Sequence, residues 1–170
     1  GLSFAYVHYT LGEVAFQFHY LILAALGAGF LIWNWQPAKI FMGDVGSCFF
    51  GFIFAVLAVW SHFSVGLSLP IIFILHMSFL LDTTYTLLVR GSRKQKVYLA
   101  HRDHAYQHAV QSGFSHAQVS MVYMAVNLLW LLPLALYALN RPELGWGLLG
   151  LSALPLLAFA FYFKAGIKPN

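Results

Sequence analysis

Long apolar stretches alternate with short polar breaks along this chain. Five of these stretches have about the 20 mostly apolar residues that a helix needs to span a bilayer. They lie at residues 14–33, 46–63, 67–89, 117–139 and 145–163. None shows the strict apolar–polar alternation of a membrane β-barrel strand. The pattern therefore predicts an all-α fold, a polytopic bundle of about five transmembrane helices.

The composition agrees with a membrane protein. Hydrophobic residues make up 61% of the chain and charged residues 8%, whereas soluble domains carry roughly 25% charged residues. A single water-soluble core could not bury so much apolar surface. The one cysteine, Cys48, lies in an apolar run, which predicts a small lipid-facing or core residue and no disulfide within the chain. Without an internal repeat or a low-complexity segment, we expect one membrane domain over residues 1–170.

One loop, at residues 90–116, concentrates the positive charge. It contains five of the nine Lys and Arg residues, namely Arg90, Arg93, Lys94, Lys96 and Arg102. The positive-inside rule places this loop in the cytoplasm, and counting spans from it places the break at 34–45 on the same side. The net charge of +4 can there meet anionic lipid headgroups or an anionic substrate. Alternatively, Arg93, Lys94 and Lys96 only fix the orientation of the chain in the membrane and bind no ligand. We expect no nucleic-acid partner.

Asp44 is one of only five acidic residues, and it lies between Gly43 and Gly46 just before a helical run that starts near Ser47. Glycines let a ligand approach the backbone, and a helix N-terminus offers free N–H groups to an anion. A carboxylate there can hold a magnesium ion that also contacts substrate phosphates. The alternative is that Asp44 is a helix N-cap with no further function.

Asp82 lies within an apolar stretch, eight residues before Arg90. Eight helical residues cover roughly 12 Å, so Asp82 is expected below the membrane surface. Intramembrane carboxylates usually face a polar interior and carry function, and we therefore assign Asp82 to substrate binding or to support of the site. In a purely structural interpretation, its hydrogen bonds would come from Thr83, Thr84 and Thr86.

Three histidines, His101, His104 and His108, cluster in the basic loop. On a helix they would share one face. Zinc binding is disfavoured by the neighbouring Arg102 and by the lack of thiolates. A surface facing phosphates fits better, with arginine as a bidentate clamp and histidine as a donor or proton shuttle.

The segment "NWQPAKIFMGDVGS", followed by an apolar helix, resembles the hallmark of the polyprenyl-phosphate N-acetylhexosamine-1-phosphate transferases (glycosyltransferase family 4). This family includes the phospho-MurNAc-pentapeptide translocase and enzymes that begin O-antigen and teichoic acid synthesis. The strings "LLDTTYTLLVR" and "HRDHAYQ" follow at about the expected intervals, and the second is most similar to the branch that initiates O-antigen or related surface glycans. The resemblance covers residues 30–116.

The resemblance implies that phospho-N-acetylhexosamine passes from a UDP-sugar to undecaprenyl phosphate, with release of UMP, at the cytoplasmic face of a bacterial inner membrane. It implies a magnesium ion bound by Asp44, with Phe41 and Gly43 near the uridine and Asn34 near the nucleotide. Arg102 and His104 match the segment of the family's histidine motif and are assigned to catalysis with Asp44. A homodimer is left open.

Two departures from the family pattern change the expectation. The family's paired aspartates are missing, and the chain begins with Gly1, so we expect it to be the C-terminal half of a longer enzyme and inactive alone. Tyr106 and Gln107 replace the last two histidines of the H-x-H-H motif, so no role is carried onto His101 or His108. The alternative class is a non-enzymatic membrane protein, either a transporter or a subunit that binds anionic lipid.

Overall fold

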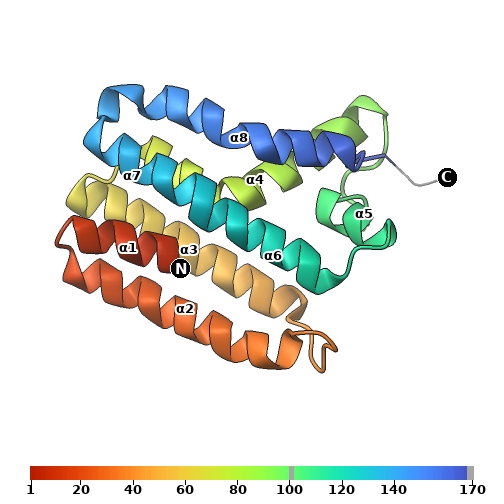
Figure 1. Cartoon of the computed structure of the whole chain (residues 1–170), viewed down its shortest axis with the longest axis horizontal. Helices are drawn as coiled ribbons and strands as arrows, with labels where there is room; N and C mark the ends of the chain where they lie inside the picture. The colour runs from red at the N-terminus through yellow and green to blue at the C-terminus, as the bar shows by residue number, and fades with distance from the viewer. Residues whose placement is uncertain (100–101, 168–170) are drawn as a thin grey trace. The chain divides into compact units, whose positions relative to one another are not determined.

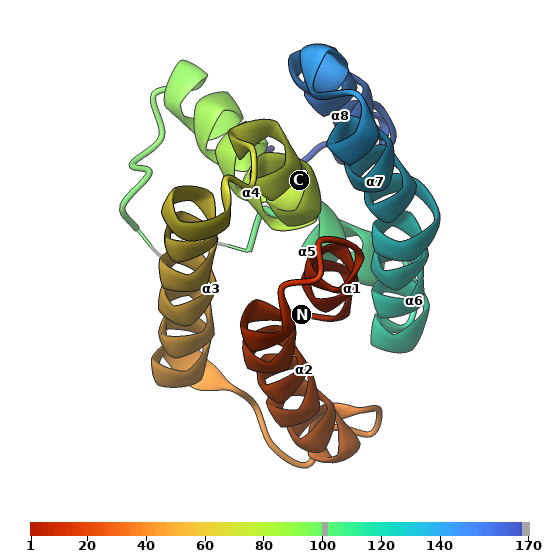
Figure 2. The ribbon, with the colours of Figure 1, turned by 90° about the vertical axis from the view of Figure 1, so that its left-hand side faces the viewer.

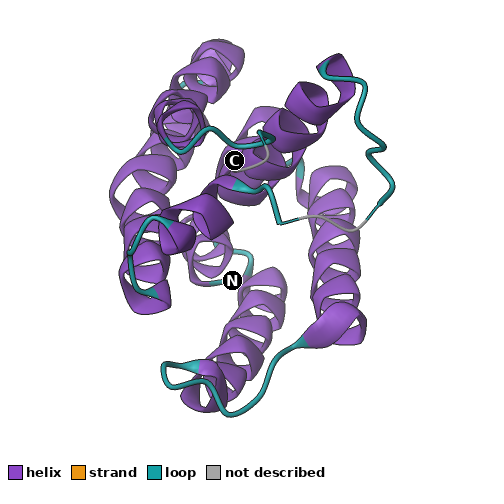
Figure 3. Ribbon diagram, turned by 90° about the vertical axis from the view of Figure 1, so that its right-hand side faces the viewer, coloured by secondary structure: helices purple, strands orange, loops and turns teal. Residues whose placement is uncertain are grey.

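The structure is a computed structural model that describes residues 1–99 and 102–167, and these residues form helices and loops without any strand (Figure 3). His101 therefore lies outside the described residues. The chain folds into two compact units, Gly1–Ile72 and Phe73–Asn170. Each unit is described separately below.

The first unit contains α1 (Leu2–Thr10), α2 (Val14–Asn34) and α3 (Gly43–Val65). The short helix α1, which the sequence did not predict, lies beside α2 (Figures 1 and 2). Gly12 takes a φ of 76° in the turn between them, a conformation that glycine adopts at little cost.

A buried hydrogen bond joins α1 to α3. The His8 ring and Ser61 are both fully buried. His8 Nδ1 lies 2.9 Å from the carbonyl oxygen of Phe4, and Nε2 lies 2.7 Å from Ser61 Oγ. Because a carbonyl can only accept, Nδ1 carries a proton. Burial lowers the pKa of His8, and in the neutral ring Nε2 accepts from the serine hydroxyl. The bond thus satisfies two polar groups in the apolar core of this unit.

The second unit begins within α4 and continues through six further helical segments. Its elements are α4 (Leu69–Ser92), α5 (Ala105–Gln111), α6 (His116–Val126), the π-helical η1 (Asn127–Leu131), α7 (Leu132–Asn140), the 3₁₀ turn η2 (Pro142–Leu144) and α8 (Gly145–Tyr162). The segments α6, η1 and α7 form one continuous span. The Asn127 amide donates to Ser78 Oγ and to the Tyr123 carbonyl, each at 2.8 Å, and so ties this span to α4. Helix α8 packs beside α7 (Figure 1).

Five helices of the described chain are long and apolar enough to cross a membrane. They are Val14–Asn34, Gly43–Val65, Leu69–Ser92, His116–Asn140 and Pro142–Tyr162. The predicted all-α bundle with five spans is confirmed, and the chain is a multi-pass membrane protein. One boundary was predicted wrongly, because α3 begins at Gly43 and not near Ser47. The first turn of α3 contains glycine and aspartate, so the apolar pattern from which the boundary was predicted does not extend to it.

Candidate functional site

Asp44 lies in the first turn of α3 and is exposed. The helix has Met42 at its N-cap position and no side-chain hydrogen bond there, so the interpretation of Asp44 as the N-cap is wrong. The nearby Ser47 hydroxyl donates to the carbonyls of Gly43 and Asp44 at 3.0 and 3.1 Å. No hydrogen bond or ion pair engages the Asp44 carboxylate within residues 1–99 and 102–167. This carboxylate is therefore available to a ligand.

The other residues assigned to nucleotide binding lie around the loop that precedes α3. Asn34 is the last residue of α2, and its amide donates to the Ile40 carbonyl at 2.8 Å, which helps to shape the loop. Phe41 is 82% exposed. Gly43 has a φ of 63°, in the left-handed region that favours glycine. An exposed aromatic ring and a carboxylate thus lie three residues apart, beside the free N–H groups of a helix start.

The donor set around Asp44 fits a magnesium ion only as part of a larger complex. Among the described residues, no three histidine, cysteine, aspartate or glutamate side chains form a group that could hold a metal ion. Magnesium is usually bound by one or two carboxylates, with substrate phosphates and water completing its octahedron. A single unpaired carboxylate meets that requirement when a phosphate is present.

Asp82, in the second unit, accepts one hydrogen bond with one carboxylate oxygen and makes a longer electrostatic contact with the other. Its Oδ1 accepts a hydrogen bond from the Ala105 N–H at 2.9 Å, and its Oδ2 lies 3.5 Å from His104 Nδ1. The residue is 8% exposed. Both partners come from the start of α5, and not from the neighbouring threonines of the purely structural interpretation. The carboxylate is thus directed toward the start of α5.

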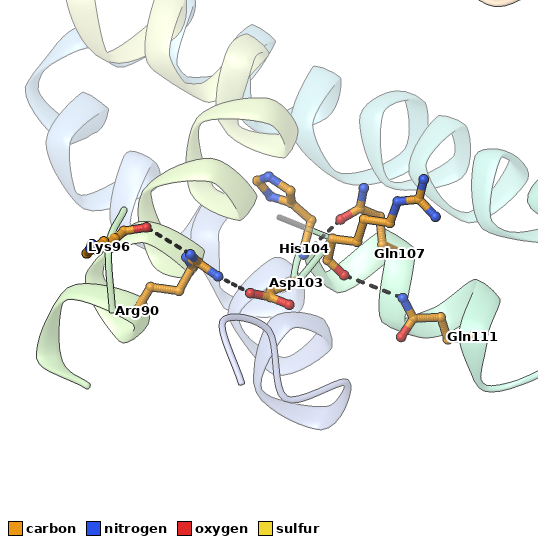
Figure 4. A network of polar contacts seen from close by, with 7 residues as sticks. Arg90, Lys96, Asp103, His104, Gln107 and Gln111 are labelled. Atoms are coloured by element: carbon orange, nitrogen blue, oxygen red, sulfur yellow. Dashed lines mark hydrogen bonds and ion pairs between the residues drawn. The ribbon is translucent and has the colours of Figure 1, made fainter. Parts of the chain in front are cut away.

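A buried ion pair between Arg90 and Asp103 holds the loop that leads to α5 (Figure 4). Arg90 is 3% exposed and also donates to the Lys96 carbonyl at 3.1 Å. The Asp103 carbonyl accepts from the Gly166 N–H at 2.7 Å. From the sequence, Arg90 was counted only among the basic residues that place the loop in the cytoplasm, and Asp103 was given no role. The available signal was that Asp103 is the only acid in the basic loop.

Of the histidines that the structure describes in this loop, only His108 lies on helix α5. Helix α5 begins only at Ala105, so His104 precedes it and occupies the N-cap position. The His104 backbone N–H donates to Gln107 Oε1 at 3.2 Å (Figure 4). His108 is buried and its Nδ1 donates to the Phe163 carbonyl at 2.9 Å, which ties α5 to the end of α8. His108 therefore has a structural contact, and His101 lies outside the described residues.

Around His104 the surface is partly open. The His104 side chain is 20% exposed, and its ring stacks on Tyr106 with centroids 5.8 Å apart. Burial and the nearby Asp82 carboxylate raise the pKa of Tyr106, while a hydrogen bond with Gln107 lowers it. Tyr106 therefore stays neutral near pH 7 and can donate a hydrogen bond, a role that the sequence did not predict. The Arg102 side chain is exposed.

The structure brings some of the predicted site residues together. Asp82 contacts His104 directly, and Arg102 lies two residues before His104 in the same loop. Asn34, Phe41, Gly43 and Asp44 lie in the first unit, on either side of one loop. Convergence of Asp44 with Asp82, Arg102 and His104 on one cleft stays a prediction.

Comparison with known proteins identifies similar sequences. The model of glycosyl transferase family 4 matches residues 1–62, which include Asn34, Phe41, Gly43 and Asp44. A probable undecaprenyl-phosphate N-acetylglucosaminyl 1-phosphate transferase of Bacillus subtilis (strain 168) is 31% identical over 112 residues, which are 65% of this chain and 31% of that protein. A phospho-N-acetylmuramoyl-pentapeptide-transferase of Staphylococcus aureus (strain JH9) is 29% identical over 127 residues, 74% of this chain and 38% of that protein.

The matches thus span only about a third of the length of these curated relatives. No solved structure gives a significant match. The family match covers the segment around Asp44, and the matches to the relatives cover most of the chain. The chain is thus similar to glycosyl transferase family 4 over residues 1–62, and to transferases of a sugar phosphate over most of its length.

Proposed function

We propose that this protein transfers a phospho-N-acetylhexosamine from a UDP-sugar to undecaprenyl phosphate and thereby begins the synthesis of O-antigen or another cell-envelope glycan. An oxygen of the acceptor phosphate attacks the phosphorus that carries the sugar. The bond from that phosphorus to the bridging oxygen breaks, and UMP leaves. The products are undecaprenyl-diphosphate-sugar and UMP.

The observation that carries this proposal is the exposed, unpaired carboxylate of Asp44 in the first turn of α3. It lies in the segment that the family model matches. The two curated relatives support the same class of reaction, because both are named as transferases of a sugar phosphate. The positive-inside rule assigns the basic loop to the cytoplasm. Two spans, α3 and α4, separate it from the loop before α3, so both loops are expected on the same side. This supports a site at the cytoplasmic face of a bacterial inner membrane.

Each residue has a task that its chemistry allows. The Asp44 carboxylate would hold a magnesium ion, which when bound neutralises charge on the phosphate oxygens. Phe41 offers an exposed ring on which a uracil can stack, and the backbone at Gly43 can approach the nucleotide closely. Arg102 can clamp phosphate oxygens with two parallel hydrogen bonds. His104 can donate a hydrogen bond to a phosphate or move a proton.

The test is a transfer assay in membranes that contain the protein in its natural full-length form. A panel of UDP-N-acetylhexosamines is supplied with undecaprenyl phosphate and Mg²⁺, and both the lipid product and UMP are measured. At least one donor should give equal amounts of the two products. If no donor yields UMP while the protein is inserted and folded, the proposed function is wrong.

The variant Asp44→Asn tests the assigned metal ligand. Removing the charge while keeping the shape should abolish transfer without changing membrane insertion. Glu143→Gln is a matched control, because Glu143 is an exposed acid in a turn, 3.7 Å from Arg141, and should leave activity unchanged. Substantial activity in Asp44→Asn would show that Asp44 does not hold the metal, even if the enzyme class is correct.

A further inference from the structure

The two oxygens of the Asp82 carboxylate face two neighbouring groups at the start of α5, a backbone N–H and a histidine ring. One oxygen accepts the Ala105 N–H at 2.9 Å, and the other faces His104 Nδ1 at 3.5 Å. Ala105 lies 23 positions further along the sequence, across a basic loop. Because both oxygens face protein groups and the residue is 8% exposed, little of the carboxylate is left for a substrate.

The surrounding contacts fix the backbone on either side of His104. On one side, Asp103 pairs with Arg90, and its carbonyl accepts from the Gly166 N–H. On the other side, His108 is bound to the Phe163 carbonyl. The loop is therefore anchored to both α4 and the end of α8. The orientation of the imidazole ring needs contacts of its own, and Asp82 and the stacked Tyr106 supply two of them.

A carboxylate facing a ring nitrogen also selects the position of the proton. An ionised carboxylate only accepts, so Asp82 Oδ2, at 3.5 Å from Nδ1, favours a proton on that nitrogen, although this distance is longer than an ordinary hydrogen bond. In the neutral ring this leaves the lone pair on Nε2. A carboxylate that acts in this way on a histidine sets both its tautomer and its orientation.

We propose that Asp82 is a positioning residue, which holds the His104 imidazole in one orientation and with one tautomer through the start of α5. This inference rests on the proposed function for the substrate that His104 would meet. Of the two roles expected from the sequence, substrate binding and support of the site, it selects the second and specifies how the support is given. The partly exposed His104 ring meets the substrate, and Asp82 acts only through it.

The main variant is Asp82→Asn. The amide oxygen can still accept the Ala105 N–H, so the start of α5 keeps its hydrogen bond. The amide NH₂ group then faces His104 Nδ1 as a donor, which reverses the polarity at the ring. Loss of a residue that orients a metal-bound histidine typically lowers activity about 10-fold to 100-fold, and we take the same range for Asp82 and His104. We expect such a loss in kcat for transfer, with KM for the UDP-sugar changed less than about twofold. Thr84→Val, at an exposed position two residues away, should match the wild type.

A double-mutant comparison separates positioning from a general structural effect. If Asp82 acts through His104, Asp82→Asn should cost little further activity in a His104→Gln background. Asp82→Glu keeps the charge and should lie between the wild type and Asp82→Asn, and it replaces Asp82→Asn if that variant does not fold. Equal losses in both backgrounds, or wild-type kcat in both Asp82 variants, would overturn the inference.

A second readout does not depend on activity. Labelling of histidines with diethyl pyrocarbonate, followed by mass spectrometry, reports how freely the His104 ring meets solvent. In Asp82→Asn, His104 should be labelled severalfold faster, while the exposed His116 keeps its rate. If the wild type transfers no sugar, the proposed function fails, and faster labelling of His104 alone still supports the contact with Asp82. If transfer occurs but neither kcat nor labelling changes, the positioning role is wrong.

Discussion

The ion pair between Arg90 and Asp103 makes a quantitative prediction. Both side chains are almost completely buried, with 4% and 8% of their surface exposed. In Asp103→Asn the guanidinium of Arg90 loses its counter-charge but cannot give up its proton. Its remaining described hydrogen bond is to the Lys96 carbonyl, and its Nε has no partner among the described residues. The variant therefore leaves a buried, uncompensated charge.

The size of the effect follows from that burial. Removing one partner of a buried ion pair typically costs about 3–5 kcal/mol, whereas replacing both partners with apolar residues is often close to neutral. We therefore expect Asp103→Asn to lower the stability of this region by about 3 kcal/mol or more. Arg90→Met should also be destabilising, because it leaves the buried Asp103 carboxylate without its counter-charge. The double variant Arg90→Met/Asp103→Leu should recover most of the loss.

Hydrogen–deuterium exchange of the purified protein in detergent measures this effect locally. A loss of about 3 kcal/mol corresponds to an exchange rate about 100-fold faster in peptides that cover α5, provided that exchange follows local opening. Glu143→Gln is the control, since its contact with Arg141 is exposed and such surface pairs contribute at most about 1 kcal/mol. The reasoning is refuted if Asp103→Asn exchanges like the wild type, or if the double variant is as unstable as the two single losses combined.

Two further predictions concern the packing of α4 and the basic loop. Gly166→Ala should lower the free energy of unfolding by about 2–4 kcal/mol, because Gly166 has a φ of 78° and a Cβ there would lie 2.8 Å from the Val89 Cβ. The control Gly147→Ala lies in open space within α8 and should be neutral or stabilising. Equal melting temperatures for the two variants would contradict this prediction. Arg93→Gln should reduce transfer modestly, by an amount that added salt reproduces in the wild type, because exposed charges are screened. Arg102→Ala should instead reduce transfer sharply at every ionic strength, and a salt response like that of Arg93→Gln would show that Arg102 is only an electrostatic anchor.

The apolar pattern determined the number of spans, because a segment of about 20 consecutive apolar residues can be buried only as a membrane-crossing helix or in a core of similar length. It could not place the start of α3, since Gly43 and Asp44 are compatible with either a loop or a first helical turn. The short helix α1 was missed because nine residues are too few to show a membrane span. The family segment around Asp44 was identified from the sequence because its residues are contiguous.

Only the tertiary structure decided the partners of the charged residues in the second unit. A count of basic residues treats Arg90 and Arg93 alike, but Arg90 is buried against Asp103 and Arg93 is exposed. Likewise, the depth of Asp82 could be estimated from helix geometry, but its contacts with His104 and Ala105 could not. These contacts join residues that are far apart in sequence, and they depend on how the loop folds back onto α4, which no local pattern of residues specifies.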